Sequence, residues 1–161
     1  MGLRAAILVT SDRISRGEAR DRSGPAAREI LRGAAQVVEL RVVPDERDGI
    51  AAALREWSEA GVDLILTVGG TGLGPRDVTP EATRAVIERE APGIAAALLL
   101  RGLSSTPRAM LSRATAGVRG RSLIVNLPGS PSAVQELVPY LMKVVPHAIE
   151  SVQGASEPYP D

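Results

Sequence analysis

The sequence predicts an α/β domain in which a mostly parallel central sheet carries helices on both faces. Short apolar runs alternate along the chain with segments whose apolar residues recur at helical spacing. The apolar runs are nearly continuous, which is typical of strands buried on both faces. The chain has 161 residues, the size of one domain with one core. We expect a single domain over residues 1–153 and a flexible tail over residues 154–161.

Four apolar runs are expected to be strands. Each is bounded by polar or turn-forming residues, and together they lie at residues 5–10, 37–43, 62–68 and 122–127. Helical spacing between these runs predicts helices over residues 24–34, 50–61 and 79–90. A final helix follows residue 130, and we expect Pro139 and Pro146 to bend or divide it.

Two of the helices carry more specific expectations. Thr79 and Pro80 form a helix-start pair, a hydroxyl cap followed by proline at the first helical position. Residues 93–103, GIAAALLLRGL, form an apolar helix candidate that is too short to cross a membrane and is expected to pack inside. Between residues 106 and 120 the pattern is too weak to predict an element.

The composition argues against several classes of function. Nineteen basic residues balance nineteen acidic ones, so no overall field attracts a nucleic acid or a membrane surface. Only three residues are aromatic, too few for a platform on which bases stack. The chain has no cysteine and one histidine, His147, which excludes disulfides, thiolate catalysis and a cysteine or histidine metal cluster. We expect a cytosolic protein that binds neither nucleic acid nor membrane.

Four polar loops follow the predicted strands. They begin at Ser11, at Pro44, at Gly69 and at Asn126. Parallel sheets of this kind bind ligands at the carboxyl ends of their strands. If the strands are parallel, all four loops share one rim, and that rim is the expected site.

The loop after the third strand, TVGGTGLGPRDVTPEAT, is rich in glycine. It lacks the third glycine of the dinucleotide fingerprint and the lysine of a P-loop. Residues without a Cβ still allow backbone amides to approach an anion closely, and Thr71 adds a hydroxyl. The alternative interpretation is an ordinary tight turn after a strand.

Two acids give the glycine loop a possible chemical role. Asp77 lies shortly before a predicted helix, and Asp45 ends a neighbouring predicted strand. Mg²⁺ usually takes one or two carboxylates together with phosphate oxygens of a ligand, so the pair is a candidate metal-phosphate site. The alternatives are structural: Asp77 caps its loop or pairs with Arg76, and Asp45 is an ordinary loop acid.

The remaining polar candidates have weaker patterns. Asp12 follows Ser11 in a common turn start, and Glu81 complements the dipole of its predicted helix. Asn126 and Ser130, in the segment NLPGSP, either end a strand or hydrogen-bond a heterocycle. Ser130 has no nucleophile context, because no histidine is near and the hydrolase elbow pattern is absent.

Several segments together carry a resemblance to a known family. GGTGLGPRDVTPEAT, VTSDRISRGEARDRSG, VVPDE and LSRATAGVRGRSLIVNLPGSP, with the closing helix, closely resemble the MogA/MoaB family of molybdenum-cofactor biosynthesis proteins. The likeness covers nearly the whole chain in order. The resemblance implies a three-layer α/β/α fold, a homotrimer or a hexamer of trimers, and binding of molybdopterin.

For the MogA-like branch the resemblance implies an enzyme. Molybdopterin and Mg-ATP would give adenylyl-molybdopterin and pyrophosphate, in preparation for metal insertion and hand-over to a metal-insertion protein. The acids that match Asp45 and Asp77 are regarded as catalytic in that branch and would hold Mg²⁺. The positions that match the ligand site are Ser11, Asp12, Gly69, Gly70, Thr71, Gly72, Glu81, Asn126, Pro128, Gly129 and Ser130.

This chemistry is compatible with the residues available. The attacking phosphate is already ionised at neutral pH, so positioning and charge neutralisation would carry the reaction without a strong base. Two alternatives remain from the sequence. One is a non-catalytic, MoaB-like protein that binds molybdopterin or acts as a scaffold. The other is a relative of competence-damage-type proteins that act on nicotinamide nucleotides.

Overall fold

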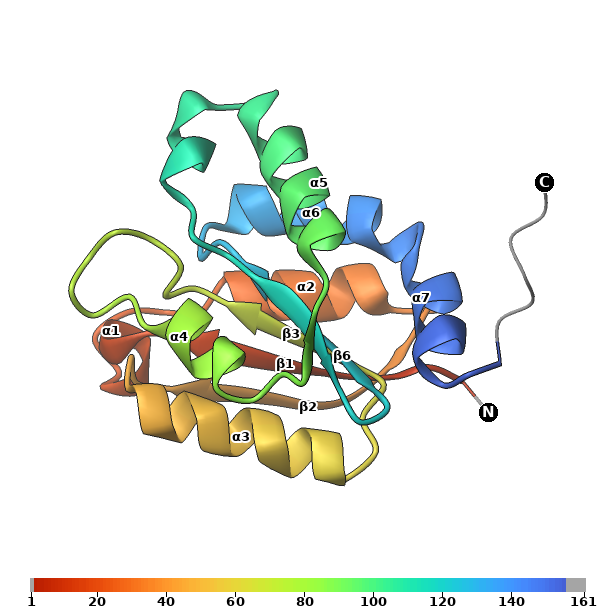
Figure 1. Ribbon diagram of the computed structural model, residues 1–161. Helices are drawn as coiled ribbons and strands as arrows, with labels where there is room; N and C mark the ends of the chain where they lie inside the picture. Colours follow the sequence, from red (N-terminus) through yellow and green to blue (C-terminus); the bar gives the residue numbers. More distant parts are fainter. Residues whose placement is uncertain (1, 156–161) are drawn as a thin grey trace.

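The protein, described over residues 2–155 in a computed structural model, is built around one mixed sheet (Figure 1). The described residues form six strands in the order β2-β1-β3-β6-β5-β4. Residues 156–161, most of the expected tail, lie outside the described residues.

Four strands are parallel neighbours and confirm the predicted mostly parallel sheet. They are β1 (Arg4–Thr10), β2 (Gln36–Val43), β3 (Leu64–Val68) and β6 (Ser122–Leu127). Two strands at the other edge were not predicted: β5 (Ala116–Arg119) runs antiparallel to β6, and the two-residue β4 (Arg89–Glu90) runs antiparallel to β5. Both are too short to show a periodic pattern.

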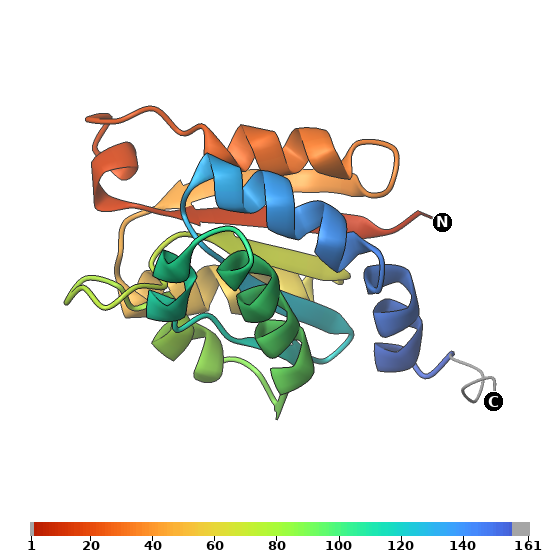
Figure 2. The same ribbon diagram turned by 90° about the horizontal axis from the view of Figure 1, so that it is seen from above.

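Helices cover both faces of the sheet, as predicted (Figures 1 and 2). On one face, α2 (Ser23–Leu31), α6 (Pro131–Met142) and α7 (Val145–Val152) share an apolar core with Ile7 and Val9 of β1. On the other face, α3 (Arg47–Glu59) and α4 (Thr79–Arg84) share a second core with Ala6 and Leu8. Alternate residues of β1 thus serve two apolar cores, which explains the continuous apolar run in its sequence.

The helix expected over residues 79–90 is shorter than predicted. It ends at Arg84, and the chain then joins the sheet, where the Glu88 amide donates to the Val118 carbonyl at 2.8 Å. Thr79 is not the cap, because Val78 occupies that position and makes no side-chain cap bond. The Thr79 hydroxyl instead lies 3.1 Å from the hydroxyl of Thr10.

The apolar helix at residues 93–103 forms as α5 (Pro92–Leu103), but the expectation that it packs inside is wrong. Only Leu98 among its residues is buried, and Leu100 is 68% exposed. The helix packs on α6 and on the 3-10 helix η1 (Pro107–Leu111) and projects from the sheet (Figure 1). The helix also contacts β5 and β6, but its Leu99 and Leu100 remain exposed in this chain.

The C-terminal helix is divided as predicted. α6 contains Pro139 and ends at Met142, and α7 begins with Pro146 in its first turn. None of the helices within residues 2–155 has the length and apolar character that a bilayer crossing requires.

Candidate functional site

Four loops meet where the parallel strands end. The register aligns Thr10 with Val43, Val9 with Val68, and Val68 with Leu127, so the four strands stop at one edge of the sheet. The short helix α1 (Asp12–Ser15) follows β1 directly at this edge (Figure 1). The expected rim therefore exists.

The first two glycines of the glycine loop are required by backbone conformation and by space. Gly69 and Gly70 have φ of 102° and 66°, in the region that favours glycine. A Cβ on Gly70 would overlap the hydroxyl of Thr79 and lie 3.2 Å from Asp45 Oδ1. The turn therefore lies directly against the Asp45 carboxylate, which a side chain would displace.

The next two glycines make room for Asp77. A Cβ on Gly72 or Gly74 would lie 2.9 or 2.8 Å from Asp77 Oδ2, too close for either to carry a side chain without a shift. The Gly74 amide donates to the same oxygen at 2.9 Å, and the Asp77 amide donates to the Gly74 carbonyl at 3.0 Å. The loop thus closes on its own carboxylate.

Asp45 is held at the centre of the rim by a reciprocal pair of hydrogen bonds. Its Oδ2 accepts from the Asp12 amide, and its own amide donates to Asp12 Oδ1, both at 3.0 Å. Its Oδ1 is buried and has no hydrogen-bond partner, the only such side-chain atom found within residues 2–155. Burial raises the pKa of the Asp45 carboxyl above its usual value, and the charges of Asp12 and Asp77 add to that effect.

An ion pair covers the rim beside Asp45. Arg76 donates to both oxygens of Asp12, at 3.0 and 3.1 Å. These hydrogen bonds, followed by the one from the Asp45 amide, lower the pKa of the Asp12 carboxyl. The sequence alternative in which Asp77 pairs with Arg76 is therefore not what the structure shows: Arg76 binds Asp12.

Two cavities adjoin at this rim. A small polar one of about 250 Å³ is lined by Asp45, Asp77, Gly69 and Gly70, among others. A larger one of about 880 Å³ lies between the glycine loop, α5, η1 and α6, and its lining is mostly apolar. Gly129 lines both, and the volume of the larger cavity is typical of a small-molecule site.

Residues of the NLPGSP loop line the larger cavity, and two of them also hold the surrounding structure in place. Asn126 is buried: its amide nitrogen donates to Thr67 and Thr83, each at 2.9 Å, and its oxygen accepts from the Thr115 amide. Ser130 caps α6 by accepting from Ala133. Asn126, Pro128, Gly129 and Ser130 all line the larger cavity.

The other expected residues line the cavities or bind neighbouring protein groups. Ser11 caps α1 by accepting from the Ile14 amide at 3.2 Å, and it also lines the polar cavity. Thr71 and Gly72 line the larger cavity. Glu81, in the first turn of α4, pairs with Arg113, which lowers the pKa of the Glu81 carboxyl.

Two structural features of the site were not predicted. One is Arg113, which follows η1 in a segment without a periodic pattern. The other is a group of buried threonines, Thr10, Thr67, Thr79 and Thr83, beneath the glycine turn. A strand that ends in threonine gives no sign that its hydroxyl meets another sixty-nine residues away, so no local signal identifies this group.

The side chains at the rim suit a Mg²⁺ ion that shares its ligands with a bound phosphate, and not a metal held by protein ligands alone. Within residues 2–155 no group of three or more His, Cys, Asp or Glu side chains is arranged to hold a metal. The carboxylates of Asp45 and Asp77 are among the groups that line the polar cavity, with Asp21 also at its wall, and one oxygen of Asp45 has no hydrogen-bond partner. Mg²⁺ commonly takes one or two carboxylates and completes its shell with water and phosphate oxygens.

Comparison with known proteins agrees with this architecture. The family described as "Probable molybdopterin binding domain" matches residues 6–147. The molybdopterin biosynthesis enzyme MoaB of Thermus thermophilus has a TM-score of 0.89 and 49% identity, covering 98% of this chain and 99% of that one.

Two curated relatives differ in how much of their length they share with this chain. Molybdopterin adenylyltransferase of Helicobacter pylori is 38% identical over 92% of this chain and 86% of its own length. Gephyrin of Dictyostelium discoideum is 42% identical over 89% of this chain, which spans only 21% of that protein. The expected resemblance is confirmed: this chain belongs to the molybdopterin-binding domain family that includes MogA and MoaB.

Proposed function

We propose that the protein acts in molybdenum-cofactor biosynthesis as a molybdopterin adenylyltransferase. In this reaction a phosphate oxygen of molybdopterin attacks the α-phosphorus of ATP, and the bond from that phosphorus to the bridging oxygen breaks. The products are adenylyl-molybdopterin and pyrophosphate. The observation that carries the proposal is the unpartnered buried oxygen of Asp45, a residue that lines the same polar cavity as Asp77.

The two cavities suit the two halves of the reaction. The larger, mostly apolar cavity has room for a pterin, and its edge is formed by Thr71, Gly72 and Gly129. The polar cavity beyond Gly129 is where the reacting phosphates would lie. A ligand that spans both would pass over the glycine turn, whose residues leave the backbone accessible.

Asp45 and Asp77 would hold Mg²⁺ in the polar cavity, where the ion would neutralise charge on the phosphates when bound. Asp12 fixes Asp45 through the reciprocal hydrogen bonds, and Arg76 holds Asp12. A phosphate needs no base at neutral pH, so these residues have only to position the reactants and balance their charges.

The test is direct. Purified protein is incubated with molybdopterin, ATP and Mg²⁺, and adenylylated pterin and released pyrophosphate are measured. We expect both products in equal amounts, and neither when Mg²⁺ is removed with a chelator. Binding of molybdopterin without turnover would contradict an adenylyltransferase and favour a non-catalytic binding protein.

We also propose that the protein is a homo-oligomer, with the trimer as the basic unit. Support comes from the apolar surface that α5 and η1 leave uncovered: Leu99, Leu100, Met110 and Leu111 are all exposed. Large exposed apolar side chains gathered on neighbouring elements commonly mark protein interfaces. The same surface borders the larger cavity, so association would also shape the proposed pterin site.

A further inference from the structure

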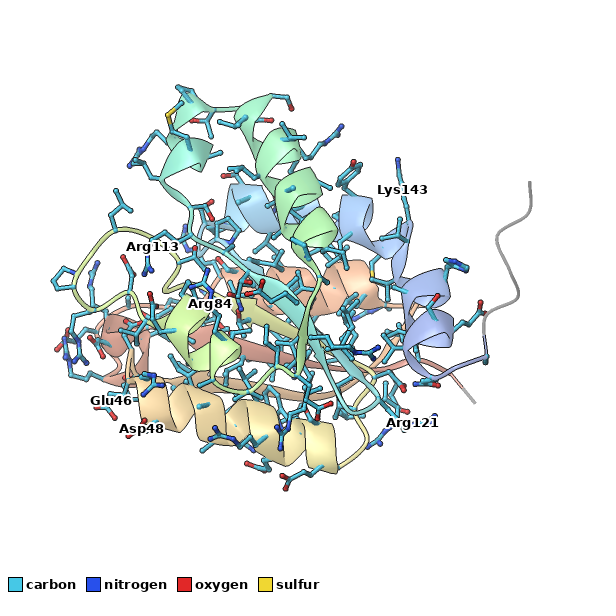
Figure 3. The ribbon with its side chains drawn as sticks, viewed as in Figure 1. Glu46, Asp48, Arg84, Arg113, Arg121 and Lys143 are labelled. Atoms are coloured by element: carbon cyan, nitrogen blue, oxygen red, sulfur yellow. The ribbon has the colours of Figure 1, made fainter. Side chains whose placement is uncertain are left out.

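Arg113 joins the glycine loop to α4 through its guanidinium group. Its Nε donates to the Gly72 carbonyl at 2.8 Å, and its Nη2 donates to the Asp77 carbonyl at 2.7 Å. Its Nη1 pairs with the Glu81 carboxylate, and its main-chain amide donates to the Thr71 carbonyl at 2.8 Å. In Figure 3 the side chain reaches from the segment after η1 towards the glycine loop, on the α4 side of the rim.

The side-chain contacts to the main chain fall at the two ends of one loop segment, residues 72–77. Gly72 is the first residue of this segment and Asp77 is the last. Leu73, between them, is 66% exposed. Apolar packing of Leu73 therefore does not hold the segment in place. Within the segment Gly74 and Asp77 are bonded to each other, and Arg76 binds Asp12 of α1. The Arg113 guanidinium is the side-chain group that binds the main chain at both ends of the segment and so fixes the shape in which the Gly74 amide meets Asp77 Oδ2.

The Arg113 guanidinium binds the main chain of Asp77 and not its carboxylate. Its ionic partner is the carboxylate of Glu81. The Asp77 carboxylate therefore makes no hydrogen bond to Arg113 among the described contacts, and it lines the polar cavity. A planar guanidinium can bind three acceptors in different directions at once, whereas an ammonium group on a flexible stem cannot hold the same three in place.

We propose that Arg113 is a positioning residue: it holds the main chain at Gly72 and Asp77 so that the Asp77 carboxylate faces Asp45 across the polar cavity. The geometric part of this inference concerns the loop alone. Its consequence for turnover rests on the proposed adenylyltransferase function, so the two parts need separate measurements.

The first measurement is the exchange rate of the Gly74 amide hydrogen, followed by NMR. That amide donates to Asp77 Oδ2, so its protection reports where the carboxylate lies. We expect Arg113→Lys to exchange roughly tenfold faster, the size expected from losing one or two hydrogen bonds. Glu81→Gln should shift the rate in the same direction but less, because the guanidinium still reaches Gly72 and Asp77.

The second measurement is metal binding. Mn²⁺ is titrated in the presence of a non-hydrolysable ATP analogue, and the water-proton relaxation rate is recorded. Arg113→Lys should need about tenfold more Mn²⁺ for half-saturation, in line with effects of residues that orient metal ligands. In turnover assays the variant should lose kcat while its KM for molybdopterin changes less than about twofold, since Arg113 does not line the larger cavity.

The matched control is Arg84→Ala. Arg84 is an exposed arginine in the last turn of α4 whose charge also acts on Glu81, but it makes no hydrogen bond to the loop among the described contacts. It should match the wild type in exchange, metal binding and turnover.

The outcomes separate the two proposals. If Arg113→Lys lowers the melting temperature but keeps wild-type Gly74 exchange and Mn²⁺ binding, Arg113 is only structural and the inference is overturned. If the wild type forms no adenylylated product, the proposed function fails, and the Gly74 measurement still decides the role of Arg113. Should Arg113→Lys not fold, Glu81→Gln decides, and an unchanged Gly74 rate in that variant counts against the inference.

Discussion

At the residue scale, the buried carboxylate of Asp45 suits the binding of a cation but lowers the stability of the fold. Its carboxylate is desolvated, lies near Asp12 and Asp77, and has one oxygen without a partner. Because the folded state raises the pKa of this carboxyl, the folded protein holds the proton to a higher pH than the unfolded chain. Stability from this group is therefore present below its usual pKa of 3.8 and is lost as the pH rises through the raised folded value.

The stability of Asp45→Asn tests this conflict. We expect its melting temperature at pH 7, without Mg²⁺ or nucleotide, to exceed that of the wild type by roughly 1–3 °C, because a buried charge is removed while the shape is kept. Thermal unfolding followed by circular dichroism measures it. Asp48→Asn is the control: this exposed acid complements the α3 dipole, so its removal should not raise the melting temperature. A variant that melts at or below the wild type would show that the burial cost is absent.

Asp77→Asn should separate fold from activity. The amide oxygen can still accept from the Gly74 amide, so the loop closes as before and the melting temperature should change little. Turnover should fall by about 100-fold or more, as when a group that balances transition-state charge is lost. The rate of pyrophosphate release measures it, with Asp48→Asn as the same chemical change outside the rim. Full activity in Asp77→Asn would refute a metal-holding role for that carboxylate.

How far single residues could be predicted depends on whether their role is local. Gly69 and Gly70 follow an apolar run directly, so a tight turn at a strand end was expected from the sequence alone. The position of Asn126 was predicted too, but its bonds were not, because Thr67 and Thr83 reach it only after the strands assemble. Arg113 gave no signal, since its partners lie more than thirty residues away.

At the scale of elements, periodic segments were predicted well and short pairings were not. The four parallel strands follow from continuous apolar runs, and α3 from apolar spacing over thirteen residues. In contrast, β4 and β5 exist because their backbone groups complete the sheet beside β6, a pairing that no local pattern encodes. The same pairing ends α4 early. Tertiary hydrogen bonds therefore overrode a helical pattern after Arg84.

Charged side chains connect the edge strand β2 to α3, and the stability that this ion pair contributes should depend on pH. Arg41 donates to both oxygens of Glu56, at 2.8 and 2.9 Å, and stacks on Trp57. The hydrogen bond from Arg41 lowers the pKa of the Glu56 carboxyl. Stability from Glu56 is thus present above its usual value of 4.5 and is lost as the pH falls through the lower folded value.

Glu56→Gln should therefore be less stable than the wild type at pH 7, and the difference should shrink at pH 3, as the pH falls towards and through the lowered folded pKa of Glu56. The difference in melting temperature at pH 7 should be roughly 1–2 °C, because exposed ion pairs contribute little. Melting curves at both pH values measure it. Glu90→Gln, an exposed glutamate of β4 without an ion pair among the described contacts, should show no such pH-dependent difference. A gap that does not shrink at pH 3 would mean that the Arg41 pair is not its cause.

At the scale of the whole molecule, the error about α5 is informative. Its apolar sequence predicted burial, but only Leu98 of the helix is buried in this chain. Leu99 and Leu100 remain exposed, and Met110 and Leu111 of η1 add to the same projecting unit. An apolar face that one chain leaves open is most simply covered by another copy of that chain.

Leu100→Glu tests that explanation. We expect the wild type to sediment as a trimer or a multiple of it, and the variant to dissociate towards the monomer, because a carboxylate at a buried interface must be desolvated without a partner. Sedimentation velocity at several concentrations measures the change. Val144→Glu, the same substitution at another exposed apolar residue, between α6 and α7, should leave the assembly intact. If the wild type is monomeric at all concentrations, or Leu100→Glu assembles as the wild type does, then α5 is not the interface and its open face needs a different partner.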